Sequence, residues 1–287
     1  MISNKGFIEG LDSFTDKFGI RIRQSIDRNL DLFFTNKGDC GEYLGSLVSD
    51  KLGTGSGGSG FDLSDGSLAD EVKFACLIQP SRCNECGSKV LFFEKECRRC
   101  NSTDLKPLND SRWSIDTDAG IKYHEEMDNY ILQLLEPKEY TSSCRTFIYK
   151  YYIVDAHNKY FLNYLQNQYN GGSKKTANFI PYSFDFYMSE PIKLIEIEIE
   201  VGEEGNEYNT IFWDLENTTV EEMPTSILRK KELHTLLDNI DISYRKSDKL
   251  DTLTELVDNN YSGDIRGLLS LRDKSLGKDR GETNRRL

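Results

Sequence analysis

The sequence lacks the features that mark membrane-spanning and exported proteins. No stretch approaches the roughly 18 consecutive apolar residues that a transmembrane helix requires. A secretory signal begins with a positively charged region followed by an apolar run, and the first residues, MISNKGFIEGLDSF, show neither pattern. We therefore expect a cytoplasmic protein. Hydrophobic residues still make up 37% of the 287 positions and aromatic residues 11%, which is enough to build a large folded core.

Positive charge and histidine are also scarce. Lys and Arg number 36 against 48 Asp and Glu, which gives a net charge of −12. This balance argues against binding nucleic acid through a bulk positive field, although local basic patches and metal-bound carboxylates can coexist with a negative total. The three histidines are too few and too scattered for a catalytic metal site built on imidazoles. No G-x-x-x-x-G-K-[ST] motif is present, so a phosphate-binding P-loop is unsupported.

Cysteine is present in an odd number, seven, and four of the seven form one tight cluster. In a chain without an export signal, metal ligation fits such a cluster better than disulfides. The array has the spacing C-x2-C-x10-C-x2-C and consists of Cys83, Cys86, Cys97 and Cys100. Four thiolates suit tetrahedral Zn²⁺, and because they fill every ligand position the metal should be structural. The array resembles a zinc ribbon, and whether it only staples its loop or also contacts a ligand stays open.

The central part of the chain alternates helical and strand patterns, which predicts an α/β or α+β core. The predicted helices lie near Gly120–Leu135 and Lys159–Tyr169, and the predicted strands at Thr146–Val154, Ser183–Met188 and Ile192–Val201. The last strand alternates isoleucine with glutamate, the pattern of a sheet with one solvated face.

Two short strands are predicted between a glycine-rich stretch and the cysteine cluster, joined by a turn at Asp65. Glu71 and Lys73 are two residues apart on the second strand, so their side chains leave the same face, and Asp70 should point to the opposite one. Asp62, on the first strand, can come beside them. Two neighbouring carboxylates repel unless a cation lies between them, so Asp62 and Glu71 predict a site for Mg²⁺ or Mn²⁺. Lys73 can then orient or activate a water, or stabilise charge on a phosphoryl oxygen.

An Asp followed by Glu-x-Lys on the next strand resembles the PD-(D/E)XK nuclease superfamily, which includes many restriction endonucleases. The residue before Asp62 is Phe61 and not proline, and the spacing to Glu71 is short but compatible with a hairpin. The resemblance implies an accessory glutamate on the preceding helix, for which Glu42 is the candidate. The whole stretch 41–74, followed by a cysteine-rich insertion, also resembles the MamI-type group of type II restriction enzymes.

The C-terminal residues 224–258 predict two short amphipathic helices joined by an extended link. This layout is similar to a SAP-type module, which grips the DNA backbone through basic residues near its second helix; here these would be Arg245, Lys246 and Lys249. The glycine usual in that link is missing, and a helical hairpin packed on the core is the alternative. The residues that follow carry a net positive charge and can contact phosphate or stay solvated.

Together these patterns predict a fold of the α/β (α+β) class. Its PD-(D/E)XK-type mixed sheet is flanked by helices and accompanied by an inserted zinc ribbon and a small C-terminal helical module. The expected division is a nuclease core at 1–80 and 104–220, a zinc-ribbon insertion at 81–103, a SAP-like module at 222–260 and a basic tail at 261–287.

The resemblance implies a Mg²⁺-dependent type II endonuclease that cuts double-stranded DNA as a homodimer. Asp62 and Glu71 would hold the metal with help from Glu42, and Lys73 would orient or activate the attacking water. Two alternatives stay open, a structure-selective nuclease of repair or recombination and a non-catalytic zinc-ribbon adaptor that binds DNA.

Overall fold

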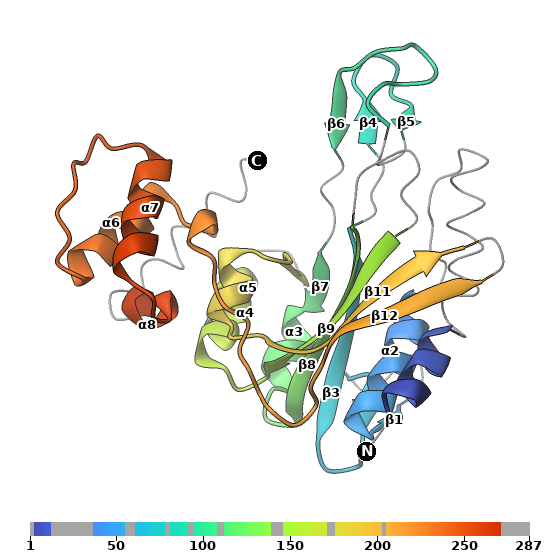
Figure 1. The fold of residues 1–287 in the computed structure, drawn as a ribbon. Helices are drawn as coiled ribbons and strands as arrows, with labels where there is room; N and C mark the ends of the chain where they lie inside the picture. The colour runs from blue at the N-terminus through green and yellow to red at the C-terminus, as the bar shows by residue number, and fades with distance from the viewer. Residues whose placement is uncertain are drawn as a thin grey trace.

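A seven-stranded mixed sheet forms the centre of the computed structural model (Figure 1), which describes residues 3–12, 37–54, 61–77, 81–90, 94–107, 112–138, 146–170, 176–202 and 205–270. The strand order is β1-β2-β3-β8-β9-β11-β12. β3 and β8 run parallel, and the other neighbouring pairs are antiparallel. The strands are β1 (Leu52–Gly53), β2 (Leu63–Ser64), β3 (Ala69–Cys76), β8 (Met127–Pro137), β9 (Thr146–Asp155), β11 (Ile192–Val201) and β12 (Asn206–Trp213).

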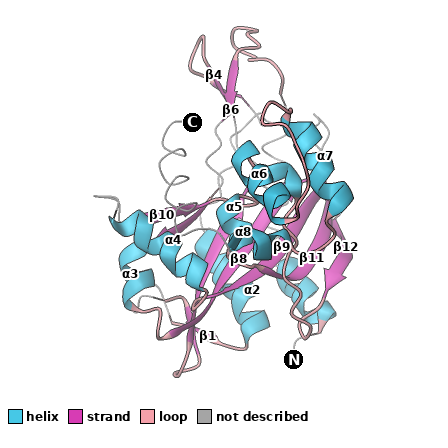
Figure 2. Cartoon of the chain, turned by 90° about the vertical axis from the view of Figure 1, so that its left-hand side faces the viewer, coloured by secondary structure: helices cyan, strands magenta, loops and turns pink. Residues whose placement is uncertain are grey.

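Different elements cover the two faces of this sheet (Figures 1 and 2). A helix at residues 4–12 and α2 (Lys37–Ser49) pack on one face, where they share a buried cluster with Val72, Ile131 and Tyr149. The other face carries α3 (Thr117–Lys122), α4 (Lys159–Asn170), α5 (Phe184–Met188) and a two-stranded sheet of β7 (Trp113–Asp116) and β10 (Thr176–Phe179). The structure is therefore a mixed α+β fold with a large sheet flanked by helices.

The alternation of side chains along β3 assigns each residue to one of these faces. Val72 and Cys76 belong to the buried cluster under α2, while Ala75 belongs to the cluster on the other face. Gly45 lets α2 approach β3 closely, because a Cβ there would lie only 3.3 Å from Val72. The odd-numbered residues Glu71 and Lys73 consequently point away from α2.

The cysteine-rich segment forms a small sheet of its own, with the order β5-β4-β6. Its strands are β4 (Ser81–Cys83), β5 (Lys89–Val90) and β6 (Leu105–Pro107), so its last strand extends past residue 103. It projects from the end of the main sheet (Figure 1), and its buried residues Cys83, Val90 and Cys97 form a cluster separate from the other two.

The C-terminal helices form a group on the side of α4 and α5 (Figures 1 and 2). They comprise the 3₁₀ turn Thr225–Ile227, α6 (Lys230–Asn239), α7 (Leu250–Asn260) and α8 (Ile265–Ser270). Two helices joined by a link were predicted here, and α6 and α7 occupy those places. The first part of the predicted basic tail is a packed helix, since Ile265 and Leu269 are buried and Arg266 pairs with Asp264. In the described part of the chain no helix combines the length and apolar character that crossing a bilayer demands.

Two predictions of local structure were wrong. The helix expected near Gly120–Leu135 is the short α3 followed by β8, a central strand whose segment Tyr130–Leu135, apolar except for Gln133, is buried between β3 and β9. The strand expected at Ser183–Met188 is helix α5, because the Ser183 side chain accepts a hydrogen bond from the Phe186 N–H and caps it.

Candidate active site and metal centre

The β2–β3 hairpin brings Asp62, Glu71 and Lys73 together. The Lys73 ammonium pairs with Oε1 of Glu71, and its Nζ lies 3.7 Å from Oδ2 of Asp62. The Asp62, Glu71 and Lys73 side chains are 26%, 13% and 21% exposed. The carboxylates of Asp62 and Glu71, from adjoining segments, thus converge on the ammonium group of Lys73 near the surface.

Backbone hydrogen bonds hold Asp62 in this place. The Val72 N–H donates to Oδ2 of Asp62 at 2.7 Å, and the Asp62 N–H donates to the Asp70 carbonyl at 3.1 Å. On the other side, the Thr54 N–H donates to the Asp62 carbonyl at 2.9 Å. The Asp62 carboxylate is therefore tied to the strand that carries Glu71 and Lys73.

The electrostatics of the site favour a bound cation. Burial raises the pKa of Glu71 to about 7, and the negative charges of Asp62 and Asp116 act in the same direction against the opposing effect of Lys73. Burial lowers the pKa of Lys73, but the charges of Glu71 and Asp62 raise it by more than burial lowers it. The net shift of this pKa is therefore upward. Lys73 is therefore an ammonium at neutral pH. Carboxylate oxygens are the ligands that Mg²⁺ prefers, and these residues fit such an ion chemically.

Glu42 lies on the helix that covers the opposite face of β3. A Cβ at the preceding Gly41 would lie 3.4 Å from Val72 and from Phe74, which places this turn of α2 at the level of Lys73 along the strand. Lys73 itself points to the other face. The structure thus gathers Asp62, Glu71 and Lys73 on one face, while the helix that carries Glu42 packs against the other.

The sequence analysis did not single out two residues close to Glu71. Tyr130 on β8 is the register partner of Glu71, so both side chains leave the same face of the sheet. Asp116 ends β7, a strand that lies against β3. Tyr130 was missed because its segment was expected to be helical, and nothing in the local sequence around Asp116 distinguishes it from other exposed acids.

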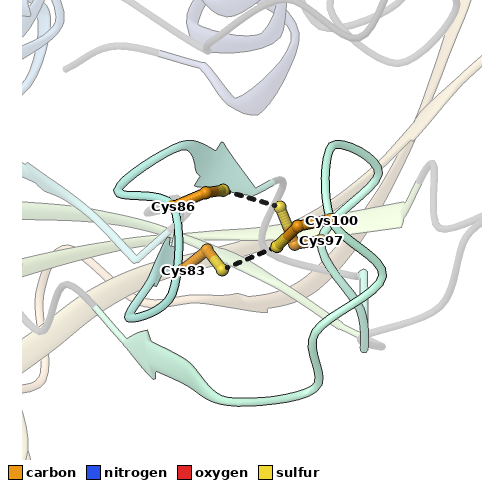
Figure 3. Close-up of side chains that lie close together, drawn as sticks. All are labelled: Cys83, Cys86, Cys97 and Cys100. Atoms are coloured by element: carbon orange, nitrogen blue, oxygen red, sulfur yellow. Dashed lines mark hydrogen bonds between the residues drawn. The ribbon is translucent and has the colours of Figure 1, made fainter.

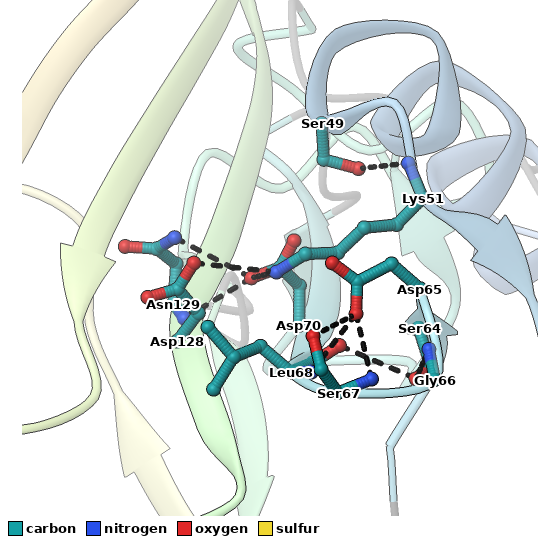
Figure 4. A network of polar contacts seen from close by, with 10 residues as sticks. All are labelled: Ser49, Lys51, Ser64, Asp65, Gly66, Ser67, Leu68, Asp70, Asp128 and Asn129. Carbon is teal, nitrogen blue, oxygen red and sulfur yellow. Dashed lines mark hydrogen bonds and ion pairs between the residues drawn. The ribbon is translucent and has the colours of Figure 1, made fainter.

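A second polar cluster lies on the α2 face of β3 (Figure 4). The Lys51 Nζ is 3.0 Å from Oδ1 of Asp70 and 3.4 Å from Oδ2 of Asp128, and the Asn129 N–H donates to the Asp70 carboxylate at 3.1 Å. The Asp70 side chain is only 2% exposed, and burial raises its pKa. Asp70 therefore points away from Glu71, as predicted, and serves a buried ion pair.

Asp65 occupies the turn of the hairpin. Its Oδ1 accepts hydrogen bonds from the N–H groups of Ser67 and Leu68 at 2.8 and 2.9 Å (Figure 4). These bonds lower the pKa of Asp65 and engage its carboxylate within the turn, as expected for a turn residue.

The four clustered cysteines also converge. Their sulfur atoms all lie within 4.8 Å of one another, with 3.5 Å between Cys83 and Cys100 and between Cys86 and Cys97 (Figure 3). Four thiolates at about 2.3 Å from a tetrahedral zinc ion would be about 3.8 Å apart, so the arrangement fits such an ion. Within the described ranges, this is the one group of three or more metal-ligating side chains gathered this closely.

The two Cys-x2-Cys turns share one backbone geometry. The Gly87 N–H donates to the Cys83 carbonyl at 2.9 Å, and the Asn101 N–H donates to the Cys97 carbonyl at 2.7 Å. Gly87 and Asn101 both have a positive φ, 70° and 57°, a conformation that glycine and asparagine adopt most readily. Each turn thus presents two thiols to the same point.

The basic residues predicted to touch DNA lie on the surface of the C-terminal helices. Arg245 and Lys246 are exposed in the link between α6 and α7, and Lys249 is exposed directly before α7. The Arg245 N–H donates to the Asp248 carboxylate at 2.8 Å, which shapes the link. Three positive side chains therefore stand together at the entry to α7.

Comparison with known proteins gives one family. The family model described as MamI restriction endonuclease matches residues 34–226, about two thirds of the chain. The matched range contains the β2–β3 hairpin and the four clustered cysteines and ends before α6. No curated protein and no solved structure matches.

Proposed function

The chain belongs to the MamI restriction endonuclease family, and from this premise we propose that it is a type II enzyme that cleaves double-stranded DNA at a specific sequence with Mg²⁺. The family makes it a nuclease that acts on DNA. The observation that carries the finer proposal is the convergence of Asp62 and Glu71 on the ammonium of Lys73. Their order along the hairpin, Asp and then Glu-x-Lys, supports the assignment of the core to the PD-(D/E)XK superfamily.

In this proposal Asp62 and Glu71 hold the catalytic cation. When bound, a divalent ion supplies Lewis-acid stabilisation of the phosphate and a more acidic water. In the metal-free protein Lys73 is an ammonium, because the two carboxylates raise its pKa against the effect of burial. In the proposal its side chain orients or activates the attacking water and stabilises negative charge on a phosphoryl oxygen. We assign Glu42 an accessory role and not that of a principal metal ligand, because α2 packs on the face of β3 opposite Glu71 and Lys73.

The remaining parts of the chain support catalysis indirectly. We assign the four cysteines to a structural zinc ion, because they fill all four tetrahedral positions. We assign Arg245, Lys246 and Lys249 to contacts with the DNA backbone. A palindromic site has twofold symmetry, so the active form is expected to be a homodimer. We propose a cytoplasmic location, where such an enzyme would cleave foreign DNA that enters the cell.

The proposal is tested by digesting long, unmethylated phage DNA with zinc-loaded protein in Mg²⁺, in Mn²⁺, in Ca²⁺ and without added metal. Ca²⁺ serves as the inactive-metal control, because a strong chelator also strips zinc from the cysteines. Sharp, reproducible bands that require Mg²⁺ support a type II enzyme, and a smear indicates a less specific nuclease. No cleavage with either Mg²⁺ or Mn²⁺ leaves the non-catalytic adaptor as the better reading.

A matched pair of variants ties the activity to the site. Glu71→Gln removes one proposed ligand, whereas Glu200→Gln removes an exposed carboxylate on β11. The expected result is loss of cleavage in the first variant and wild-type cleavage in the second. Equal cleavage by both variants overturns the assignment of Glu71.

A further inference from the structure

The Tyr130 side chain is buried beside Glu71. Tyr130 on β8 is the register partner of Glu71 on β3, so their side chains leave the same face of two strands that lie about 4.8 Å apart. Tyr130 is 1% exposed, and its hydroxyl has no hydrogen-bond partner in the described part of the chain. The charges of Glu71 and Asp116 both act on this hydroxyl.

A buried hydroxyl without a partner is unusual, because it has lost its bonds to water without a replacement. The neighbouring helix leaves room for it, since a Cβ at Gly120 would lie 2.7 Å from the Tyr130 oxygen. Burial raises the pKa of Tyr130, so the hydroxyl keeps its proton and can act as a donor at any physiological pH. A protonated donor is therefore available on the same face of the sheet as a proposed metal ligand.

We propose that Tyr130 is a positioning residue, whose hydroxyl donates a hydrogen bond to the Glu71 carboxylate when that carboxylate turns from Lys73 to a divalent cation. The inference rests on the proposed function and deepens it.

The present pairing of Glu71 explains why a second donor is needed. Oε1 of Glu71 is paired with Lys73, and the same carboxylate must face the cation when one binds. The carboxylate would then no longer be held by Lys73, and the oxygen that does not face the cation would need another donor. The Tyr130 hydroxyl replaces that bond, which fixes the rotamer of the ligand. Its action goes through Glu71 and involves no contact with the substrate.

Tyr130→Phe tests the proposal, with Tyr151→Phe as the matched control. Tyr151 is 0% exposed and its hydroxyl also has no partner among the described residues, but it lies on the α2 face beside Asp70. The binding of Mn²⁺ to zinc-loaded full-length protein is measured by calorimetry without DNA, together with the melting temperature. Tyr130→Phe should weaken Mn²⁺ binding about tenfold, the effect of one hydrogen bond to a charged group. Tyr151→Phe should leave it unchanged.

The melting temperature separates positioning from packing. Removing an unpartnered buried hydroxyl costs nothing in packing, so both variants should melt at or slightly above the wild-type temperature. Wild-type Mn²⁺ affinity in Tyr130→Phe, or equal weakening in both variants, overturns the proposal. If the wild-type protein itself binds no Mn²⁺ and cleaves no DNA, the proposed function fails and this inference falls with it.

Asp116 is the competing acceptor for the hydroxyl, and a double variant distinguishes the two. The tenfold effect of Tyr130→Phe should persist when Asp116→Asn is already present. Disappearance of the effect in that background assigns the hydroxyl to Asp116 and overturns the proposal.

Discussion

Asp70 and Glu71 are consecutive residues of β3 whose carboxylates meet different lysines on opposite faces of the sheet. Asp70 lies 3.0 Å from the Lys51 ammonium under α2, and Glu71 pairs with Lys73 on the other face. Burial raises the pKa of both carboxyl groups. In the first pair the Asp70 and Lys51 side chains are only 2% and 8% exposed. In the second pair the Glu71 and Lys73 side chains are 13% and 21% exposed and lie beside Asp62. The strand thus separates a buried structural acid from the proposed metal ligand.

Exchanging each acid for its amide should separate stability from activity. Asp70→Asn leaves the buried Lys51 with Asp128 as its remaining carboxylate, and should cost roughly 3 kcal/mol in the free energy of unfolding. Glu71→Gln should cost little stability and lower the cleavage rate at least 10²-fold, a typical effect of losing one charge-stabilising group. Urea denaturation and DNA digestion of both variants check this, and an inactive but fully stable Asp70→Asn would contradict it.

The sequence was sufficient for the elements whose pattern and propensity agree. β9, α4 and β11 lie where the pattern placed them, because alternation or helical spacing is clear in each. β8 was misread, since a central strand buried on both faces shows a nearly continuous apolar run, here interrupted by Gln133, that resembles a buried helix. Only the pairing of β8 with β3 and β9 reveals the difference, and pairing is a tertiary property.

For the candidate site, too, the local features could be predicted from the sequence and the long-range contacts could not. The hairpin is local, so the approach of Asp62 to Lys73 follows from the turn between two short strands. The neighbours of Glu71 from other parts of the chain, Tyr130 and Asp116, depend on the misread strand β8 and on β7. The face on which α2 packs likewise depends on long-range contacts, and for this reason the geometry of Glu42 could not be foreseen.

The raised pKa of Glu71 should appear in the stability of the metal-free protein. The carboxyl group titrates at about 7 in the folded chain against 4.5 in the reference state, so between these values the folded chain binds more protons than the unfolded one. The contribution of Glu71 to stability is therefore complete below about pH 4.5 and is lost as the pH rises to about 7, a change on the order of 3 kcal/mol. Urea denaturation at pH 5 and pH 8 measures it. Glu71→Gln should remove this part of the pH dependence, and equal slopes in both proteins would refute the shift.

Lys73→Ala should abolish cleavage while DNA binding is retained. The side chain supplies the positive charge of the site, and its loss should lower the rate by 10²-fold or more. Lys5→Ala removes an exposed lysine of the N-terminal helix and should cleave like the wild type. Binding in Ca²⁺ is followed by gel shift and cleavage in Mg²⁺ by digestion. Retained cleavage in Lys73→Ala would exclude a catalytic role for this residue.

Loss of zinc should unfold the cysteine-rich sheet and spare the main one. Cys97 packs in a cluster with Cys83 and Val90 that is separate from the two clusters of the seven-stranded sheet. Cys97→Ser should therefore lower the zinc content from one ion per chain to none and expose residues 81–107 to proteases. The main thermal transition should remain. A collapse of that transition in Cys97→Ser would show that the small sheet supports the core.

Removing the three basic residues at the entry to α7 should weaken DNA binding without slowing the chemical step. Each phosphate contact contributes about 0.9 to the slope of log K against log salt, so Arg245→Ala, Lys246→Ala and Lys249→Ala together should lower that slope by about 2 to 3. Cleavage at saturating DNA should be unchanged, because these residues lie outside the β2–β3 hairpin.

A control of equal charge gives this prediction its meaning, because the protein carries a net charge of −12 and any loss of positive charge weakens its attraction to DNA. The control replaces three exposed lysines on other helices, namely Lys5, Lys122 and Lys159. It should change the salt slope by less than one unit, since long-range charge is screened beyond about 10 Å at 0.1 M salt. Equal slopes of log K against log salt in the two triple variants would mean that these three residues affect DNA binding only through the net charge of the protein.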